Sequence, residues 1–200
     1  MDRKSVEICL LNAGFILDDI RNYVYIVEKN AKISPAFIPN VFSRKGRLQI
    51  GGGIGLYFDN FEKKWAETLS REERKIDRSL PMIIAIDNFI ELIDAGVFRT
   101  VNSVDEIQNV ADVIYEKCLG LPNSVEDFSR CLEFCNILDK QVAQYIHYYS
   151  EVDDKNLYFS KSASFVWWLE NLWPELANKI IGCLNRRTVT MMDRYRRDLF

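Results

Sequence analysis

Residues 47–58 alternate strictly between two kinds of position. One set is apolar apart from a single glycine: Leu48, Ile50, Gly52, Ile54, Leu56 and Phe58. The other set contains polar residues and glycines: Arg47, Gln49, Gly51, Gly53, Gly55 and Tyr57. Because successive side chains of a β-strand point to opposite faces, the pattern predicts a strand with one apolar face and one nearly bare face. A glycine run inside a strand indicates close approach of another backbone, a helix or a ligand.

The rest of the N-terminal half mixes helical and extended patterns. Apolar residues at helical spacing, stopped by Gly14, predict a helix over residues 3–13. β-Branched and aromatic residues predict a central strand over residues 23–27. The prolines that frame residues 35–42 predict an irregular or edge strand there. Residues 44–46 predict the turn of a hairpin whose second arm is the glycine strand.

Residues 59–94 complete this mixed half. Asp59 as N-cap, with Glu62 as its capping-box partner, predicts a helix with the apolar stripe Phe61, Trp65 and Leu69. The charged residues 70–79 predict a solvated helix end or a loop. Residues 82–94 fit two interpretations: a buried strand over 82–86 followed by a helix, or one buried helix throughout.

After Val101 the pattern is helical. Ser103 and Glu106 form a second capping box. Apolar residues then recur at i, i+3, i+4 and i+7 in successive stripes: Ile107 to Cys118, Val125 to Cys135, Val142 to Tyr149, Phe165 to Leu172 and Leu176 to Cys183. The sequence therefore predicts an α+β fold, a small antiparallel sheet with flanking helices and a helical C-terminal half packed on it. We expect one compact unit over residues 1–200, with a mixed part over 1–101 and a helical part over 102–200.

Composition narrows the classes of protein. The chain has 200 residues, of which 48% are hydrophobic, and a net charge of -3. This acidic balance disfavours nucleic acid as a partner, and no apolar run has the length of a membrane span. The beginning lacks the pattern of a signal peptide. Five cysteines without a Cys-x-x-Cys motif predict reduced thiols in a cytoplasmic protein.

The glycine run does not match a nucleotide-binding motif. A phosphate loop ends in Gly-Lys-Ser or Gly-Lys-Thr, whereas Leu56 and Tyr57 follow Gly55 here. The run also lies inside a strand pattern and not at a helix N-terminus, where backbone amides bind phosphate. We therefore expect no cofactor.

Metal binding and catalysis have little support. A zinc site from Cys118, Cys131, Cys135 and His147 is conceivable, but this spacing matches no established motif. We favour small core residues, because free cysteine is among the most buried residue types. His147 is the only histidine, and no Gly-x-Ser-x-Gly motif accompanies it. The sequence therefore predicts no metal and no enzymatic activity.

Trp167 is the side chain that most favours a binding surface. It lies on the opposite helix face from Phe165, Trp168 and Leu169. Either that helix is buried on two sides, which we favour, or the tryptophan is displayed as an anchor for a protein partner. The candidate partner interface is Trp167, His147 and Tyr148. The candidate small-ligand face is Gly51, Gly53, Gly55 and Tyr57.

Arginines concentrate near the C-terminus. They are Arg186, Arg187, Arg194, Arg196 and Arg197, against Asp193 and Asp198. Such a basic end could contact nucleic acid or an acidic partner. We favour a final helix whose positive charges complement its carbonyl end.

The first ninety or so residues resemble small bacterial domains of unknown function that are akin to polymorphic-toxin immunity proteins. The resemblance rests on a short helix that ends in Gly14-Phe15, on the strand Asn22-Tyr23-Val24-Tyr25, and on residues 50–58. It implies an acidic, cytoplasmic protein that neutralises a toxin by blocking its surface, and it implies no catalytic residues. The proline-framed residues 35–42 and the helical half depart from the pattern.

We therefore expect a non-enzymatic, protein-binding domain, plausibly immunity-like, whose partner is a protein such as a toxin. The alternative is a small-ligand-binding or enzymatic module that uses the face of Gly51, Gly53 and Gly55 as the floor of a pocket.

Overall fold

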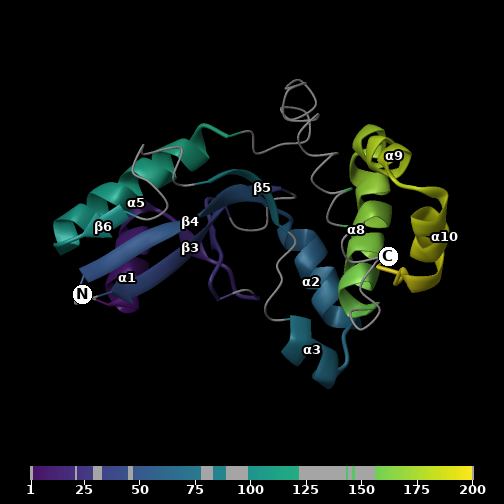
Figure 1. Ribbon diagram of the computed structural model, residues 1–200, viewed down its shortest axis with the longest axis horizontal. Helices are drawn as coiled ribbons and strands as arrows, with labels where there is room; N and C mark the ends of the chain where they lie inside the picture. Colours follow the sequence, from purple (N-terminus) through teal and green to yellow (C-terminus); the bar gives the residue numbers. More distant parts are fainter. Residues whose placement is uncertain are drawn as a thin grey trace. The chain divides into compact units, whose positions relative to one another are not determined.

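The computed structural model (Figure 1) divides into two compact units, each assembled from two stretches of the chain. Unit 1 is Met1–Asp59 with Ala85–Asn123, and unit 2 is Asn60–Ile84 with Ser124–Phe200. The structure describes residues 2–20, 22–28, 33–44, 47–77, 83–88, 99–121, 143, 146 and 156–199. The units do not divide between residues 101 and 102, because each takes sequence from both sides of that boundary. That the whole chain is one compact unit stays a prediction.

A six-stranded sheet forms from the described residues, and it confirms the α+β class. Its strands are β1 (Ile16–Leu17), β2 (Tyr25–Ile26), β3 (Ser34–Arg44), β4 (Arg47–Tyr57), β5 (Ile83–Asn88) and β6 (Arg99–Val101). The order is β1-β2-β3-β4-β5, with β6 also paired to β4. The pairs β1–β2, β2–β3, β3–β4 and β4–β6 are antiparallel. The central position of residues 23–27 is confirmed for β2, which lies between β1 and β3.

The irregularity predicted for residues 35–42 was wrong, whereas the predicted edge position holds for the part of β3 beyond Phe37, which pairs only with β4 among the described residues. β3 is a continuous strand that pairs with β4 along its whole length, from Ser34↔Tyr57 to Arg44↔Arg47. Pro35 accepts a hydrogen bond from Val27 through its carbonyl oxygen, so its backbone faces β2. Pro39 has the same parity, and its missing N–H also points to that side, beyond the last residue of β2. Neither proline therefore removes a hydrogen bond from the β3–β4 ladder.

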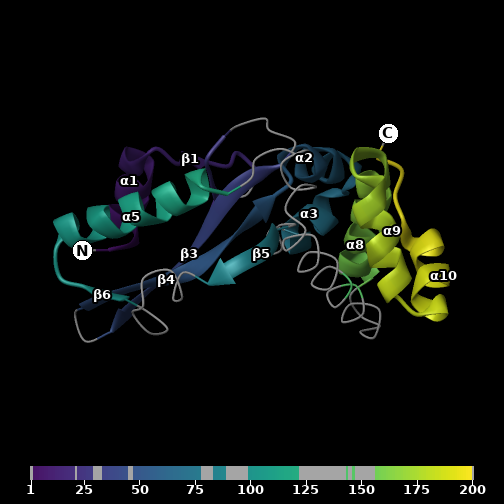
Figure 2. The same ribbon diagram turned by 90° about the horizontal axis from the view of Figure 1, so that it is seen from above.

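The apolar face of β4 is the core face of unit 1, as predicted. Two helices cover it: α1 (Arg3–Ala13) and α5 (Val104–Leu119). Figure 2 shows both on the same side of the sheet. The buried stripe of α5 is the predicted one: Ile107, Val110, Ala111, Ile114 and Cys118. Thus one helix from the C-terminal half packs on the sheet.

Gly52 is where β4 requires glycine. Its φ of +150° is rarely adopted by residues with a side chain. A Cβ there would clash with the backbone carbonyl oxygen of Ile38 and would lie 2.6 Å from Cε2 of Phe37, a fully buried core residue. The predicted close approach is therefore of the backbone of the neighbouring strand, together with the Phe37 ring.

Unit 2 is built from helices around α8. These are α2 (Asp59–Thr68), α3 (Arg71–Asp77), α8 (Asn156–Leu172), α9 (Pro174–Cys183) and α10 (Arg186–Tyr195). In both views α8 lies between α2 and α10. Phe61 of α2 packs edge-on against Phe165 of α8, with ring centres 5.1 Å apart. The predicted stripe of Phe61, Trp65 and Leu69 is buried, as expected.

Several predictions fall on the remaining segments. Residues 71–77 form the helix α3, in agreement with a solvated helix end. A single helix over 82–94 was wrong, because β5 occupies residues 83–88. Residues 89–98 and the helix expected from Ser124 lie outside the described residues, and of the stripe Val142 to Tyr149 only Ile146 is described, which is helical and buried. None of the helices described is both long and apolar enough to cross a membrane.

Candidate functional site

The glycine face of β4 is open only in part. The register places Gly53 opposite Ile38, Gly51 opposite Asn40, and Gln49 opposite Phe42. A Cβ on Gly53 would meet no atom within 4 Å, and Phe42 is 51% exposed. Gly51 and Gly55, two residues to either side of Gly53, are both buried. The open part of this face therefore centres on Gly53.

Tyr57, which was predicted to belong to the small-ligand face, is not exposed on that face. Its side chain is fully buried, and its hydroxyl donates a 2.8 Å hydrogen bond to Oδ2 of Asp18, which is itself buried. The same carboxylate oxygen accepts from the backbone N–H of Ile20 at 3.0 Å. Tyr57 therefore supports the fold of unit 1, since a buried phenol needs a hydrogen-bond partner.

Helix α8 is buried on two sides, which was the favoured interpretation of its sequence. One side carries Phe165 and Trp168, which pack with Phe61. The other side carries Ser160, Ser164 and Trp167 at helical spacing. Ser160 donates a hydrogen bond to the carbonyl of Tyr195 at the end of α10. The C-terminal segment after α10 is therefore held along this second side.

Trp167 is only partly buried, and an arginine covers its ring. The guanidinium carbon of Arg196 lies 4.4 Å from the ring centre, within the range of a cation–π contact. Arg196 itself is exposed. Among the described residues no acceptor binds the Trp167 Nε1–H, although that atom is buried. The Nε1–H of Trp65 also lacks an acceptor among the described residues, but Trp65 is fully buried, so the partial exposure of Trp167 distinguishes the two indoles.

A hollow of about 400 Å³ adjoins this pair in unit 2. It is lined by Ser164, Trp167, Asn171, Asp193, Arg196, Arg197, Asp198 and Leu199. Its walls are therefore formed by residues of α8 that are about one helical turn apart, by the end of α10 and by the segment that follows α10. They combine an aromatic ring with charges of both signs.

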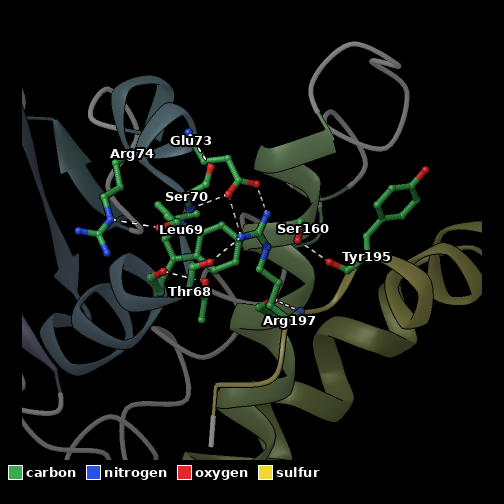
Figure 3. A network of polar contacts seen from close by, with 10 residues as sticks. Thr68, Leu69, Ser70, Glu73, Arg74, Ser160, Tyr195 and Arg197 are labelled. Atoms are coloured by element: carbon green, nitrogen blue, oxygen red, sulfur yellow. Dashed lines mark hydrogen bonds and ion pairs between the residues drawn. The ribbon is translucent and has the colours of Figure 1, made fainter.

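Arg197 fixes the segment that forms this wall (Figure 3). Its guanidinium donates to the Thr68 carbonyl at 3.0 Å and forms an ion pair with Glu73. Its backbone N–H donates to Oγ of Ser164 at 2.8 Å. Lys64 also holds the segment, by donating to the Leu199 carbonyl at 3.1 Å. Neighbouring arginines thus differ: Arg197 anchors the chain while Arg196 stays at the surface.

The contact with Arg197 changes the pKa of Glu73. The hydrogen bond from the Arg197 guanidinium lowers the pKa of Glu73 to about 2. Glu73 also accepts from the backbone N–H of Ser70 at 2.8 Å, and Ser70 Oγ accepts from the Glu73 N–H at 3.3 Å. This reciprocal capping box starts α3. Glu73 is therefore ionised, and its contacts with Ser70 and Arg197 stabilise the fold.

A buried ion pair crosses the interior of unit 2. Lys161 Nζ on α8 lies 2.8 Å from Oε1 of Glu62 on α2, and the side chains are 3% and 0% exposed. Neither residue lines the hollow beside Trp167. The pair therefore fixes α2 against α8.

Of the four candidate metal ligands, the structure describes only Cys118. Cys118 is buried in unit 1, and burial raises the pKa of its thiol to about 12. Cys131, Cys135 and His147 lie outside the described residues, as does Tyr148. No group of three or more metal-binding side chains occurs among the described residues. Of the three residues predicted for the partner interface, the structure therefore describes only Trp167.

The sequence missed the role of Arg196. The arginine cluster was visible, but pairing one of its members with Trp167 needs the chain to turn back after α10. The charge prediction for α10 was right only for Arg194, which lies in the last turn, whereas Arg186 and Arg187 lie in the first. No protein family, curated protein or solved structure matched the chain.

Proposed function

We propose that the protein is a non-enzymatic, protein-binding domain, and that Trp167 and Arg196 form the centre of its interface. The observation that carries this proposal is the half-buried Trp167 ring beneath an exposed guanidinium, with its N–H unsatisfied among the described residues. Tryptophan and arginine are the residues most enriched where binding energy concentrates in protein interfaces.

The pair is arranged for a partner that brings both an apolar group and an acceptor. Arg196 is exposed and lies over the Trp167 ring, so a partner can contact the guanidinium and the ring together. The hollow beside it accepts a side chain of the partner, and Asp193 and Asp198 at its rim add polar contacts. The immunity-like role that the sequence resemblance implies, blocking the surface of a toxin, is part of this proposal.

The test is capture of partners by the tagged protein from its native cell extract, followed by mass spectrometry. We expect one stoichiometric protein that Trp167→Ala and Arg196→Ala both lose. Trp167→Phe keeps a ring without the N–H and should retain part of the binding. The matched control is Phe42→Ala, which removes an exposed aromatic from unit 1. Folded Trp167→Ala protein that captures the same partner in the same amount would remove Trp167 from the interface.

The small-ligand alternative keeps one specific observation, the open space above Gly53. A ligand on that face should be excluded by Gly53→Val, which fills the space. A screen for compounds that raise the melting temperature of the wild-type protein but not of Gly53→Val would favour it. An empty screen would leave the face without support.

A further inference from the structure

Helix α10 has a second face that the Trp167 interface does not use. Thr188 and Met192 are buried against unit 2. A hollow of about 510 Å³ lies along the remaining sides of the helix and is lined by Arg186, Arg187, Thr190, Met191, Arg194 and Tyr195. Arg186, Thr190 and Arg194 follow one another at four-residue spacing, so they form one row along the helix.

The positive charge of this row is not balanced locally. Within the described part of the chain, none of the guanidinium groups of Arg186, Arg187 and Arg194 forms an ion pair. The first turn of α10 contains no acidic residue. Arg186 and Arg187 lie in that turn, where the helix macrodipole is already positive and disfavours cations. Arg186 and Arg187 therefore do not stabilise the helix to which they belong.

We propose that this arginine face of α10 binds an acidic segment of a protein partner. Arg186 and Arg194 are eight residues apart, or about 12 Å along the helix. Carboxylates two helical turns apart, or four residues apart in an extended segment, match that distance, since a strand advances about 3.3 Å per residue. Arginine suits such a partner because its planar group can bind a carboxylate through two parallel hydrogen bonds.

A protein segment fits this face better than nucleic acid. The chain as a whole carries a net charge of -3, whereas domains that bind nucleic acid are usually basic as a whole. Met191 and Tyr195 line the same hollow, and both residue types are enriched, with arginine, in protein interfaces. The inference shares only the class of partner with the proposed function and uses different residues, so either can fail without the other.

The test measures binding of a fluorescently labelled oligoglutamate peptide by anisotropy at low ionic strength. An oligoglutamine peptide and a single-stranded oligonucleotide of the same length serve as comparisons. We expect the wild-type protein to prefer oligoglutamate, and Arg186→Glu/Arg194→Glu to weaken its binding about tenfold or more. Arg186→Lys/Arg194→Lys should keep most of it, because the charge remains.

The matched control is Arg71→Glu/Lys179→Glu, which changes the net charge equally at exposed positions of α3 and α9. Binding that falls equally in both double variants would overturn the proposal, because it would reflect net charge alone. Absence of oligoglutamate binding to the wild-type protein, or tighter binding of the oligonucleotide, would also overturn it. If the reversal variant does not fold, Arg186→Gln/Arg194→Gln replaces it. Partner capture that still depends on Trp167 while oligoglutamate fails to bind would refute this inference alone.

Discussion

The two units bury their side chains by different physical means. Unit 1 places one apolar sheet face against α1 and α5, and holds the buried Asp18 carboxylate by hydrogen bonds from the Tyr57 hydroxyl and the Ile20 N–H. Unit 2 buries a lysine and a glutamate together between α8 and α2, and fixes its C-terminal segment by Arg197 and Glu73. The comparison indicates that unit 1 depends on backbone shape, apolar packing and the hydrogen-bonded Asp18 carboxylate, whereas unit 2 also matches a buried carboxylate with a buried ammonium group.

The central helices show the same contrast. α5 has one buried stripe and an exposed opposite side, as expected for a helix that covers a sheet. α8 is buried from Phe159 to Val166 without interruption. A helix buried on two sides must accommodate its polar residues, and α8 does so by pairing Lys161 with Glu62 and Ser160 with the Tyr195 carbonyl. The candidate interface lies where that burial ends, at Trp167.

The largest expected effect tests the buried charges of unit 2. Lys161→Met leaves the Glu62 carboxylate buried without its ammonium partner. We expect the free energy of unfolding to fall by about 3–5 kcal/mol, measured by urea denaturation. The double variant Glu62→Leu/Lys161→Met should recover most of this loss, because it buries no charge. If Lys161→Met were as stable as the double variant, the Lys161 ammonium would not be needed to offset the buried Glu62 carboxylate.

The next prediction tests backbone shape in unit 1. Gly52→Ala forces a side chain onto a residue with φ of +150° and into contact with Phe37. We expect a loss of about 1–3 kcal/mol in the free energy of unfolding. Gly53→Ala is the matched control, because its Cβ meets nothing within 4 Å, and it should be neutral or slightly stabilising. Equal losses in both variants would contradict the role of Gly52.

A smaller effect compares one helix cap in each unit. Ser103 Oγ accepts from the Glu106 N–H at 3.1 Å in unit 1, and Asn185 Oδ1 accepts from the Thr188 N–H at 2.8 Å in unit 2. Replacing either by alanine should cost about 1 kcal/mol. Native-state hydrogen exchange should show faster exchange within the unit that carries the change. Faster exchange throughout both units would indicate that they unfold together.

The smallest effect is a pH dependence in unit 2. The pKa of Glu73 is about 2 in the folded protein, against an ordinary value of 4.5. A lowered pKa stabilises the fold fully above the ordinary value, and this contribution disappears as the pH falls from about 4.5 towards 2. Because the pair is partly exposed, we expect about 1 kcal/mol or less. The melting temperature of Glu73→Gln should be lower than wild type at neutral pH and converge with it in acid. A difference in melting temperature that stays the same at every pH would exclude the ion pair as its cause.

Much of the fold was predictable where a local pattern and the tertiary environment agree. The helix over residues 3–13, the core face of β4 and the stripe of α5 follow directly from periodicity. The irregularity predicted for residues 35–42 was wrong because the sequence shows the prolines but not which side of the strand faces a neighbour. For the candidate site, periodicity separated Trp167 from the core face of its helix, but the burial of its other side required the C-terminal segment.

The sequence by itself determined the α+β class, the apolar face of the glycine strand and the helical stripes, because these depend on side-chain spacing within one element. Only the tertiary structure decided that Phe37 occupies the space of Gly52, that Glu62 meets Lys161, and that Arg196 covers Trp167. Each of these joins residues from different elements. The arginine face of α10 combines the two, since spacing places its arginines in one row and packing decides which side stays exposed.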